Sequence, residues 1–193
     1  ASAARSASPT SPRLAMAILS ARSSSAPASS ARTQESFGYE WEHFNRMLPE
    51  FDDLARAYFD IVPAGIFEDA VVLDAGCGMG RWALYIGERN VRRLYAIDLS
   101  RAIDAAAVTL EEQSETHCIQ ADLRRLPFRP GTFDFIYSLG VLHHLDDPDE
   151  GLRELGSVLK PDGATHLMVL GHGAGADMRH ATLQTIAGLL AEN

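Results

Sequence analysis

The chain has 193 residues, 46% of them hydrophobic, so it is long enough to bury a substantial core in one domain. Its net charge of −9 argues against a nucleic-acid partner, because nucleic-acid binding needs clustered Lys and Arg to neutralise phosphates. No segment approaches the roughly 18 uninterrupted apolar residues that a membrane span needs, so we expect no membrane span.

The sequence contains two cysteines, Cys77 and Cys118. One pair cannot form a disulfide framework, and its spacing is not that of metal ligands. We therefore expect a reducing compartment, thiols that serve packing, and no bound metal.

Residues 1–34 differ in composition from the rest of the chain. They contain 10 Ala, 10 Ser and four Arg but no acidic residue. Such a segment buries too little apolar area to offset its ordering entropy, which predicts disorder. The same composition resembles an organellar transit peptide. We expect a disordered or targeting leader at 1–34 and one folded domain at 35–193, located in the cytoplasm unless the leader directs the chain to an organelle.

The expected domain opens with an aromatic-rich segment at residues 37–44, followed by a helical pattern at 49–62. We expect a helical N-terminal cap over 35–68. Its aromatic rings either cover a ligand pocket, for which Tyr39 and Trp41 are the best candidates, or pack against the end of a sheet. The sequence leaves both alternatives open.

A buried strand at residues 71–73 passes into Asp74 and then into glycines at 76, 78 and 80. Glycine adopts backbone conformations closed to other residues and lets a ligand approach the main chain. Residues 81–86 indicate a helix start, so the loop lies at the carboxyl end of a strand, where open α/β sheets bind ligands. A dinucleotide fingerprint needs Gly-x-Gly-x-x-Gly, but its last position here is Arg81. The spacing therefore disfavours nicotinamide and flavin cofactors.

Two further strand candidates end in acidic residues. Residues 93–97 lead to Asp98, whose carboxylate has two acceptor oxygens and no donor, as the vicinal diol of a ribose requires. Dinucleotide-binding proteins use the same device, so Asp98 indicates a ribose without identifying the cofactor. Residues 116–123 are the third strand candidate, ending in Asp122 and Leu123.

A fourth strand is expected at residues 132–138, leading into the block 139–148, which holds two adjacent histidines. Residues 150–159 have apolar side chains at helical spacing, and a turn signal follows at 160–163. A fifth strand is expected at 165–170.

Taken in this order, the glycine loop, the two acidic strand ends and the block after the fourth strand resemble the class I S-adenosyl-L-methionine (SAM) dependent methyltransferases. The block at 139–148 is similar to that of the small-molecule branch, which includes enzymes that methylate quinone precursors. The resemblance covers residues 37–170. It implies an α/β doubly wound, mostly parallel sheet with strand order near 3-2-1-4-5 and helices on both faces. It also implies SAM as cofactor and methyl transfer to a small-molecule acceptor.

The resemblance also implies roles for individual residues. Asp74 would contact the methionine amino group directly or through water, Asp98 the ribose, and Asp122 with the Leu123 backbone the adenine. Each acidic residue has a structural alternative, since Asp74 and Asp122 are also typical of turns and Asp98 of a helix cap. The full set of expected cofactor-binding residues is Asp74, Gly76, Cys77, Gly78, Gly80, Asp98, Leu99, Asp122, Leu123 and Ser138.

His143 and His144 are the candidates for catalysis. Adjacent side chains point in different directions and no third ligand is suitably spaced, so a metal is not expected. Neutral imidazole titrates near working pH, so one histidine is a candidate for orienting the substrate or moving a proton. The alternative is that both fill the wall below the pocket.

The resembled family continues past the fifth strand through a helix and an antiparallel strand pair, but only 23 residues follow residue 170 here. We expect one final helix at 178–192 and no such pair. Strand five would then be an exposed edge, which favours pairing with a second copy in a homodimer. The alternative function is a non-catalytic or truncated SAM-fold protein acting in cofactor binding or protein association.

Overall fold

The computed structural model describes residues 50–63, 65–161 and 166–170. The expected leader, Tyr39, Trp41 and the final helix lie outside the described residues. In the described part of the chain, no helix is long and apolar enough to cross a membrane.

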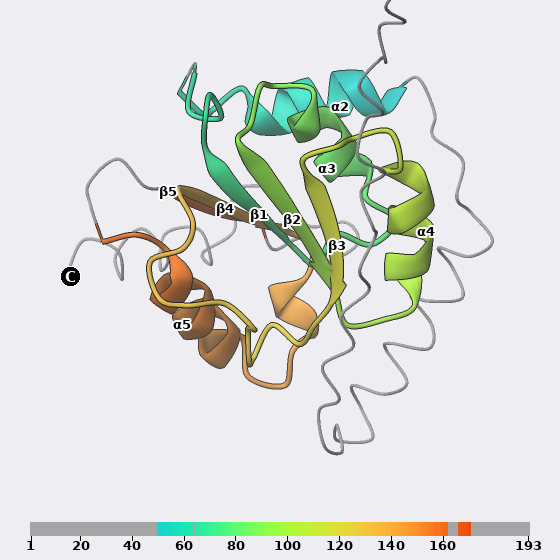
Figure 1. Ribbon diagram of the computed structural model, residues 1–193. Coiled ribbons are helices and arrows are strands. Elements are labelled where there is room, and N and C mark those ends of the chain that lie inside the picture. Colours follow the sequence, from blue (N-terminus) through green and yellow to red (C-terminus); the bar gives the residue numbers. More distant parts are fainter. Residues whose placement is uncertain (1–49, 64, 162–165, 171–193) are drawn as a thin grey trace, which may run out of the picture.

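A five-stranded parallel sheet forms the centre of the structure, in the order β3-β2-β1-β4-β5 (Figure 1). The expected α/β doubly wound fold and the strand order are confirmed. The final antiparallel pair, which we expected to be missing, concerns residues beyond 170 that the structure does not describe. The strands are β1 (Val71–Ala75), β2 (Arg93–Asp98), β3 (Thr116–Gln120), β4 (Phe135–Leu139) and β5 (His166–Leu170).

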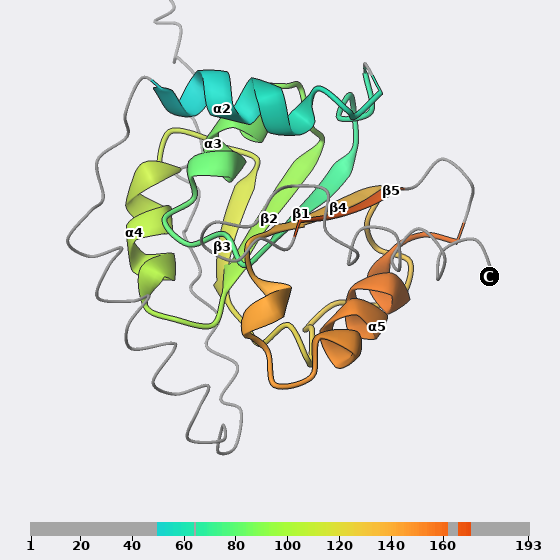
Figure 2. The same ribbon diagram turned by 180° about the vertical axis from the view of Figure 1, so that it is seen from behind.

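Helices cover both faces of the sheet, as the two views show (Figures 1 and 2). One face carries α2 (Glu50–Phe59), α3 (Arg81–Gly87) and α4 (Ala102–Thr109). The other carries the 3-10 helix η1 (Leu142–His144) and α5 (Pro148–Val158). Because both faces are buried, the strands are almost continuously apolar rather than alternating.

Alternate residues of each strand divide the core into two clusters. Val72 and Leu94 face α2, α3 and α4, whereas Leu73 and Ile97 face α5. Phe59 of α2 contacts the rings of neighbouring core residues, so α2 is packed against this face of the sheet. No residue of α2 is among the described residues that line the cleft considered below, and a capping role for residues 35–68 stays a prediction.

Two strand boundaries differ from the sequence prediction. The third strand ends at Gln120 rather than at residue 123. Asp122 and Leu123 lie in a turn that is closed by a hydrogen bond from the Arg125 amide to the Asp122 carbonyl. The fourth strand begins at Phe135 rather than at residue 132, because the amide of Phe133 donates to Val158 at the end of α5. The first of these is a turn hydrogen bond and the second a tertiary contact with the end of α5.

Helix α5 shows how the sequence fixes a helix start. The Asp147 side chain accepts hydrogen bonds from the amides of Asp149 and Glu150, and Pro148 occupies the first helical turn. Both features favour helix initiation. Leu155 is buried against the sheet, so the helix starts close to the cleft and packs along one face.

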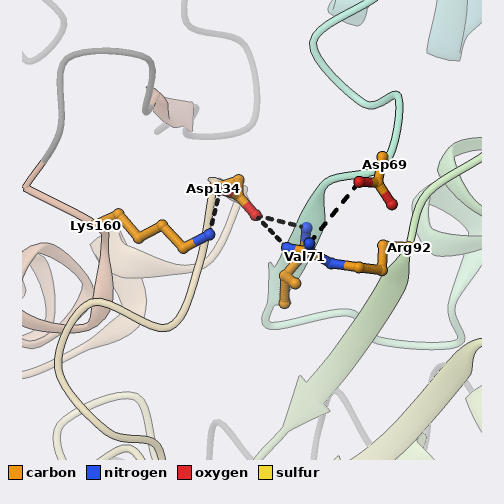
Figure 3. Close-up of polar contacts among 5 residues, drawn as sticks. All are labelled: Asp69, Val71, Arg92, Asp134 and Lys160. Carbon is orange, nitrogen blue, oxygen red and sulfur yellow. Dashed lines mark hydrogen bonds and ion pairs between the residues drawn. The ribbon is translucent and has the colours of Figure 1, made fainter.

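A polar network ties the strands together at their amino ends (Figure 3). Asp134, just before β4, accepts from the Val71 amide at 2.9 Å and also binds Lys160 and Arg92. Arg92 in turn lies 3.8 Å from Asp69. Partial burial raises the pKa of Asp134, but the hydrogen bonds from Lys160 and the Val71 amide outweigh this and hold it below its usual value. The ionised carboxylate is therefore a fixed link between β1, β2 and β4.

We expect Asp134→Ala to lower the free energy of unfolding by about 1–3 kcal/mol, because it leaves the Val71 amide without its acceptor and removes the ion pair with Lys160. Asp104→Ala is the matched control, since Asp104 forms an exposed ion pair with Arg101, and should cost less than about 0.5 kcal/mol. Urea unfolding of the full chain at neutral pH measures both. Equal losses would contradict the role given to Asp134.

The pH dependence gives a second check on the same pair of variants. Because the pKa of Asp134 is lowered by folding, its contribution is present above the ordinary pKa of an aspartate and disappears as pH falls through the folded-state value. The difference between Asp134→Ala and wild type should therefore shrink below about pH 4.

Candidate functional site

A cleft lies at the carboxyl ends of the strands, opposite the Asp134 network. Four connections line it: the loop after β1, the loop after β2, the turn after β3 and the segment after β4. Of the residues expected from the sequence, the described lining contains Gly76, Cys77, Gly78, Asp98, Leu99, Asp122, Leu123 and His144. Asp74, Gly80, Ser138 and His143 are not among the described lining residues.

The glycine loop has the conformation that its sequence predicts. Gly76, Gly78 and Gly80 have φ values of +89°, +54° and +85°, which L side chains rarely adopt. The amides of Gly76 and Cys77 both donate to the Ile97 carbonyl at 2.8 Å. These bonds fasten the loop to the end of β2.

Gly76 and Gly80 differ in what surrounds them. A Cβ on Gly76 would lie 2.4 Å from a methyl of Val141, so this position accepts only glycine while the segment after β4 closes against it. A Cβ on Gly80 would lie 3.0 Å from Leu110 and 3.3 Å from the backbone of Ala106. Gly80 therefore allows α3 to pack on α4, a role that sequence reasoning did not assign to it.

Asp98 is held in one orientation at the tip of β2. Its Oδ2 accepts from the Gly78 amide at 2.9 Å, and its Oδ1 accepts from the Ser100 amide at 2.8 Å and the Ser100 hydroxyl at 2.7 Å. The carboxylate thus joins the loops that follow β1 and β2 and also lines the cleft. An ionised carboxylate has about four acceptor sites, so these three donors leave capacity for a ligand hydroxyl.

Asp122 is bound by Arg124, a partner that the sequence analysis did not assign. The guanidinium donates through Nε at 3.0 Å and Nη2 at 2.7 Å, and the Arg124 amide donates at 2.9 Å. Burial raises the pKa of Asp122, but these bonds outweigh it and lower the pKa below its usual value. Asp122 therefore both stabilises the turn after β3 and lines the cleft, and Arg124 lines the cleft as well.

The remaining walls of the cleft are largely apolar. Leu99, Leu123, Val141 and Leu145 come from three different connections and line it together with the polar residues. The charged lining residues are Asp98, Asp122 and Asp146 against Arg81 and Arg124. One negative charge is left over, which favours a ligand that carries net positive charge.

Asp74 lies beneath the glycine loop rather than in the cleft. It is 1% exposed and pairs in register with Tyr137 of β4, which is fully buried. Burial is the main cause that raises the pKa of Asp74 to about 8, against the opposing effects of the Tyr137 hydroxyl and of Arg81. The sequence analysis missed Tyr137. The available signal was a phenol hydroxyl next to Ser138 in a strand whose other residues are apolar.

Two further expected residues are placed by packing. The Ser138 hydroxyl is buried and donates to the Ala75 carbonyl at 2.9 Å, which joins β4 to β1. Cys77 and Cys118 are both buried, and burial raises the pKa of each thiol, in Cys118 to about 11. Thiols held in this form are poor nucleophiles.

The two histidines lie on η1 with their ring centroids 3.8 Å apart. Both are exposed, but only His144 is among the described residues that line the cleft. The described residues contain no group of three His, Cys, Asp or Glu side chains that could hold a metal ion.

The fold and the site together define a class of protein. A parallel sheet in this order, with a glycine loop after β1 and an acidic residue at the tip of β2, is the architecture of the SAM-dependent methyltransferases. Residues 73–167 match the family described as "Methyltransferase domain", and this part of the chain belongs to that family. The expected resemblance is confirmed, and the cofactor of this domain is SAM.

Similar proteins include the zebrafish mitochondrial protein named arginine-hydroxylase NDUFAF5, which is 34% identical over 93 residues, 48% of this chain and 28% of that protein. A malonyl-[acyl-carrier protein] O-methyltransferase of a Methylovorus species is 30% identical over 122 residues, 58% of this chain and 41% of that protein. The chain thus spans less than half the length of these relatives.

Among solved structures, a SAM-dependent methyltransferase from Aquifex aeolicus superimposes with a TM-score of 0.60 at 19% identity. The match covers 80% of this chain and 86% of that protein. At this identity the likeness concerns the fold.

Three observations test whether the residues present fit SAM. The fixed Asp98 carboxylate offers acceptor capacity of the kind that a ribose diol needs. The apolar side chains around Asp122 suit a flat aromatic base with a polar edge. The net negative lining and the buried Asp74 carboxyl, which has an unpartnered Oδ2, suit a cation. The site fits.

Gly76→Ala should lower the affinity for S-adenosylhomocysteine, the demethylated cofactor, at least tenfold, because the added methyl collides with Val141, which also lines the cleft, and displaces this part of the wall. Gly131→Ala is the matched control: Gly131 also has positive φ, at +67°, but its new Cβ would make only an ordinary 3.7 Å contact with Pro161. We expect a similar backbone strain of about 1 kcal/mol from positive φ in both variants, but the collision and the weakened binding only in the first. Isothermal titration calorimetry measures the affinity. Unchanged binding by Gly76→Ala would refute this reading of the loop.

Proposed function

We propose that the protein is a SAM-dependent methyltransferase that transfers a methyl group to a small-molecule acceptor. The observation that carries the proposal is the Asp98 carboxylate, fixed by Gly78 and Ser100 at the point where the glycine loop meets the cleft. Family membership over residues 73–167 supports the same reaction class. The acceptor class is suggested by the sequence resemblance at 139–148 and by the O-methyltransferase relative.

In this proposal each wall of the cleft has one task. Asp98 binds the ribose hydroxyls, and Leu99 with Leu123 encloses the adenine beside Asp122. The main chain at Gly76–Gly78 would approach the methionine part closely, because two of these three residues are glycines and the Cys77 side chain is buried. These contacts would fix the position of the donor and exclude water from one side of it.

The bound cofactor supplies a methyl group on a sulfonium, which is already an activated leaving group. The chain therefore needs no covalent intermediate, and its task is to align an acceptor with the S–CH3 bond. His144 is the histidine positioned for contact with an acceptor, since it lines the cleft whereas His143 does not. Neutral imidazole is suited to orient an acceptor hydroxyl or to accept its proton.

A second candidate function is a non-catalytic or truncated SAM-fold protein that binds the cofactor or associates with another chain. Two observations favour it. Among the lining residues that the structure describes, His144 is the sole imidazole, and it is exposed. The matched domain also occurs in a relative that is named a hydroxylase. A homodimer through the edge at β5, and a location in the cytoplasm or an organelle, stay predictions.

The proposed function is tested by binding and then by turnover. SAM and S-adenosylhomocysteine should both saturate the protein in calorimetry, whereas NADPH should give no heat. Incubation with methyl-labelled SAM and a panel of phenols, acyl carboxylates and amines should then label at least one acceptor. Absence of any binding would overturn the cofactor assignment. Saturable binding without label transfer, together with a dimer by light scattering, would favour the second candidate.

Asp98→Ala should weaken SAM binding by about 10- to 100-fold, because it removes an ionised acceptor of ligand hydroxyls, whose bonds are worth about 1.5–3 kcal/mol. Asp104→Ala, on the exposed side of α4, is the control and should bind as wild type does. Calorimetry gives both dissociation constants, and circular dichroism confirms that both variants are folded. Wild-type affinity in Asp98→Ala would contradict the ribose assignment.

A further inference from the structure

Two buried polar groups meet between β1 and β4 without completing a hydrogen bond of ordinary geometry. Asp74 Oδ2 and the Tyr137 hydroxyl are the two atoms concerned, in residues that are 1% and 0% exposed. The other buried polar side chains of the described core are satisfied, Asp122 by Arg124 and Ser138 by the Ala75 carbonyl. An unsatisfied buried polar atom destabilises the folded state, so one that persists calls for an explanation.

The surroundings of Asp74 are dry and contain several titratable groups. The Tyr137 ring packs against the rings of Phe59 and Phe135, with centroid distances of 5.3 and 6.2 Å. These rings form an apolar wall on one side of the Asp74–Tyr137 pair. The groups that act on the Asp74 carboxyl are Tyr137 from β4, Asp98 from β2, Arg81 and the Ala83 amide from α3, and Cys77 from the loop. Cys118 of β3, on the far side of β2, also interacts electrostatically with Asp74.

These groups leave the carboxyl largely protonated near neutral pH. Burial raises its pKa most, Asp98 adds to this, and the Tyr137 hydroxyl and Arg81 oppose it, with a resulting value of about 8. A neutral carboxyl in this position is therefore easily ionised by one additional positive charge nearby.

A cationic ligand bound in the cleft can supply that charge. Gly76 and Cys77, two and three residues after Asp74, line the cleft, and so does Asp98, which acts electrostatically on the Asp74 carboxyl. Arg81 lines the cleft as well and is coupled electrostatically to Asp74. Because the Asp74 carboxyl is buried, water screens it poorly, and the field of a cation bound in the cleft acts on it strongly.

We propose that Asp74, positioned by Tyr137, releases a proton to solvent when the cationic cofactor binds, so that affinity for SAM increases with pH. This inference rests on the proposed function, because it assumes that SAM occupies the cleft. Tyr137 acts as a positioning residue: its hydroxyl donates to the ionised carboxylate and thereby stabilises the SAM-bound state. S-adenosylhomocysteine lacks the sulfonium charge and should release less of the proton.

Proton release on binding determines the direction in which SAM affinity changes with pH. Below about pH 8 the free protein holds the proton, so binding releases up to one proton and the association constant increases up to about tenfold per pH unit. Above that pH the proton is already absent and this contribution is constant. The amino group of SAM titrates in the same range, near an ordinary α-amino pKa of about 8. Its effect is common to wild type and variants and cancels when they are compared.

The test is calorimetric titration of SAM into the full chain at about pH 6.5, in phosphate and in Tris, whose ionisation enthalpies differ. The difference in heat gives the number of protons released. Wild type should release clearly more than Asp74→Asn, which has no proton to lose. Tyr137→Phe should move the pH profile of affinity to more alkaline values, because the ionised carboxylate loses its donor. Tyr85→Phe, an equivalent change on α3 outside this pair, should leave the profile unchanged.

The outcomes separate this inference from the function on which it rests. If SAM does not bind wild type at any pH, the cofactor assignment falls and the inference with it. If SAM binds and wild type, Asp74→Asn and Tyr137→Phe release protons equally with the same pH profile, the inference is wrong while the cofactor assignment stands. Should Asp74→Asn fail to fold by circular dichroism, the comparison of Tyr137→Phe with Tyr85→Phe still decides the question.

Discussion

The hydrogen bonds that fasten the loop after β1 to the end of β2 are the constraint on which the site depends. The Gly76 and Cys77 amides share the Ile97 carbonyl, and the Gly78 amide binds Asp98. Parallel pairing brings the carboxyl ends of β1 and β2 to the same edge, so these contacts form without any distortion of the strands. The loop is thereby organised by the same carboxylate that we propose binds the ribose.

The two ends of the sheet have different tasks. At the amino ends, Asp134 joins Val71, Arg92 and Lys160 in a charged network that stabilises the arrangement of the strands (Figure 3). At the carboxyl ends, backbone and side-chain polar groups are directed into a cleft. The charged network and the cleft are therefore at opposite ends of the buried strands.

The charge pattern of the site connects its architecture with its proposed chemistry. Acidic residues outnumber basic ones in the lining, and a further carboxyl, Asp74, lies beneath the glycine loop. A site of this kind distinguishes a sulfonium from its neutral demethylated product by charge as well as by shape. The charge pattern does not identify the methyl acceptor, because similar proteins carry names as different as hydroxylase and O-methyltransferase.

The sequence by itself determined the strands, their order through resemblance, the glycine loop and the acidic residue at the end of β2, because each is encoded by a short run of neighbouring residues. Only the tertiary structure decided that His144 rather than His143 lines the cleft and that Gly80 serves helix packing. It alone paired Asp74 with Tyr137, 63 residues away. Such contacts depend on strand register and helix position, which no local pattern of residues specifies.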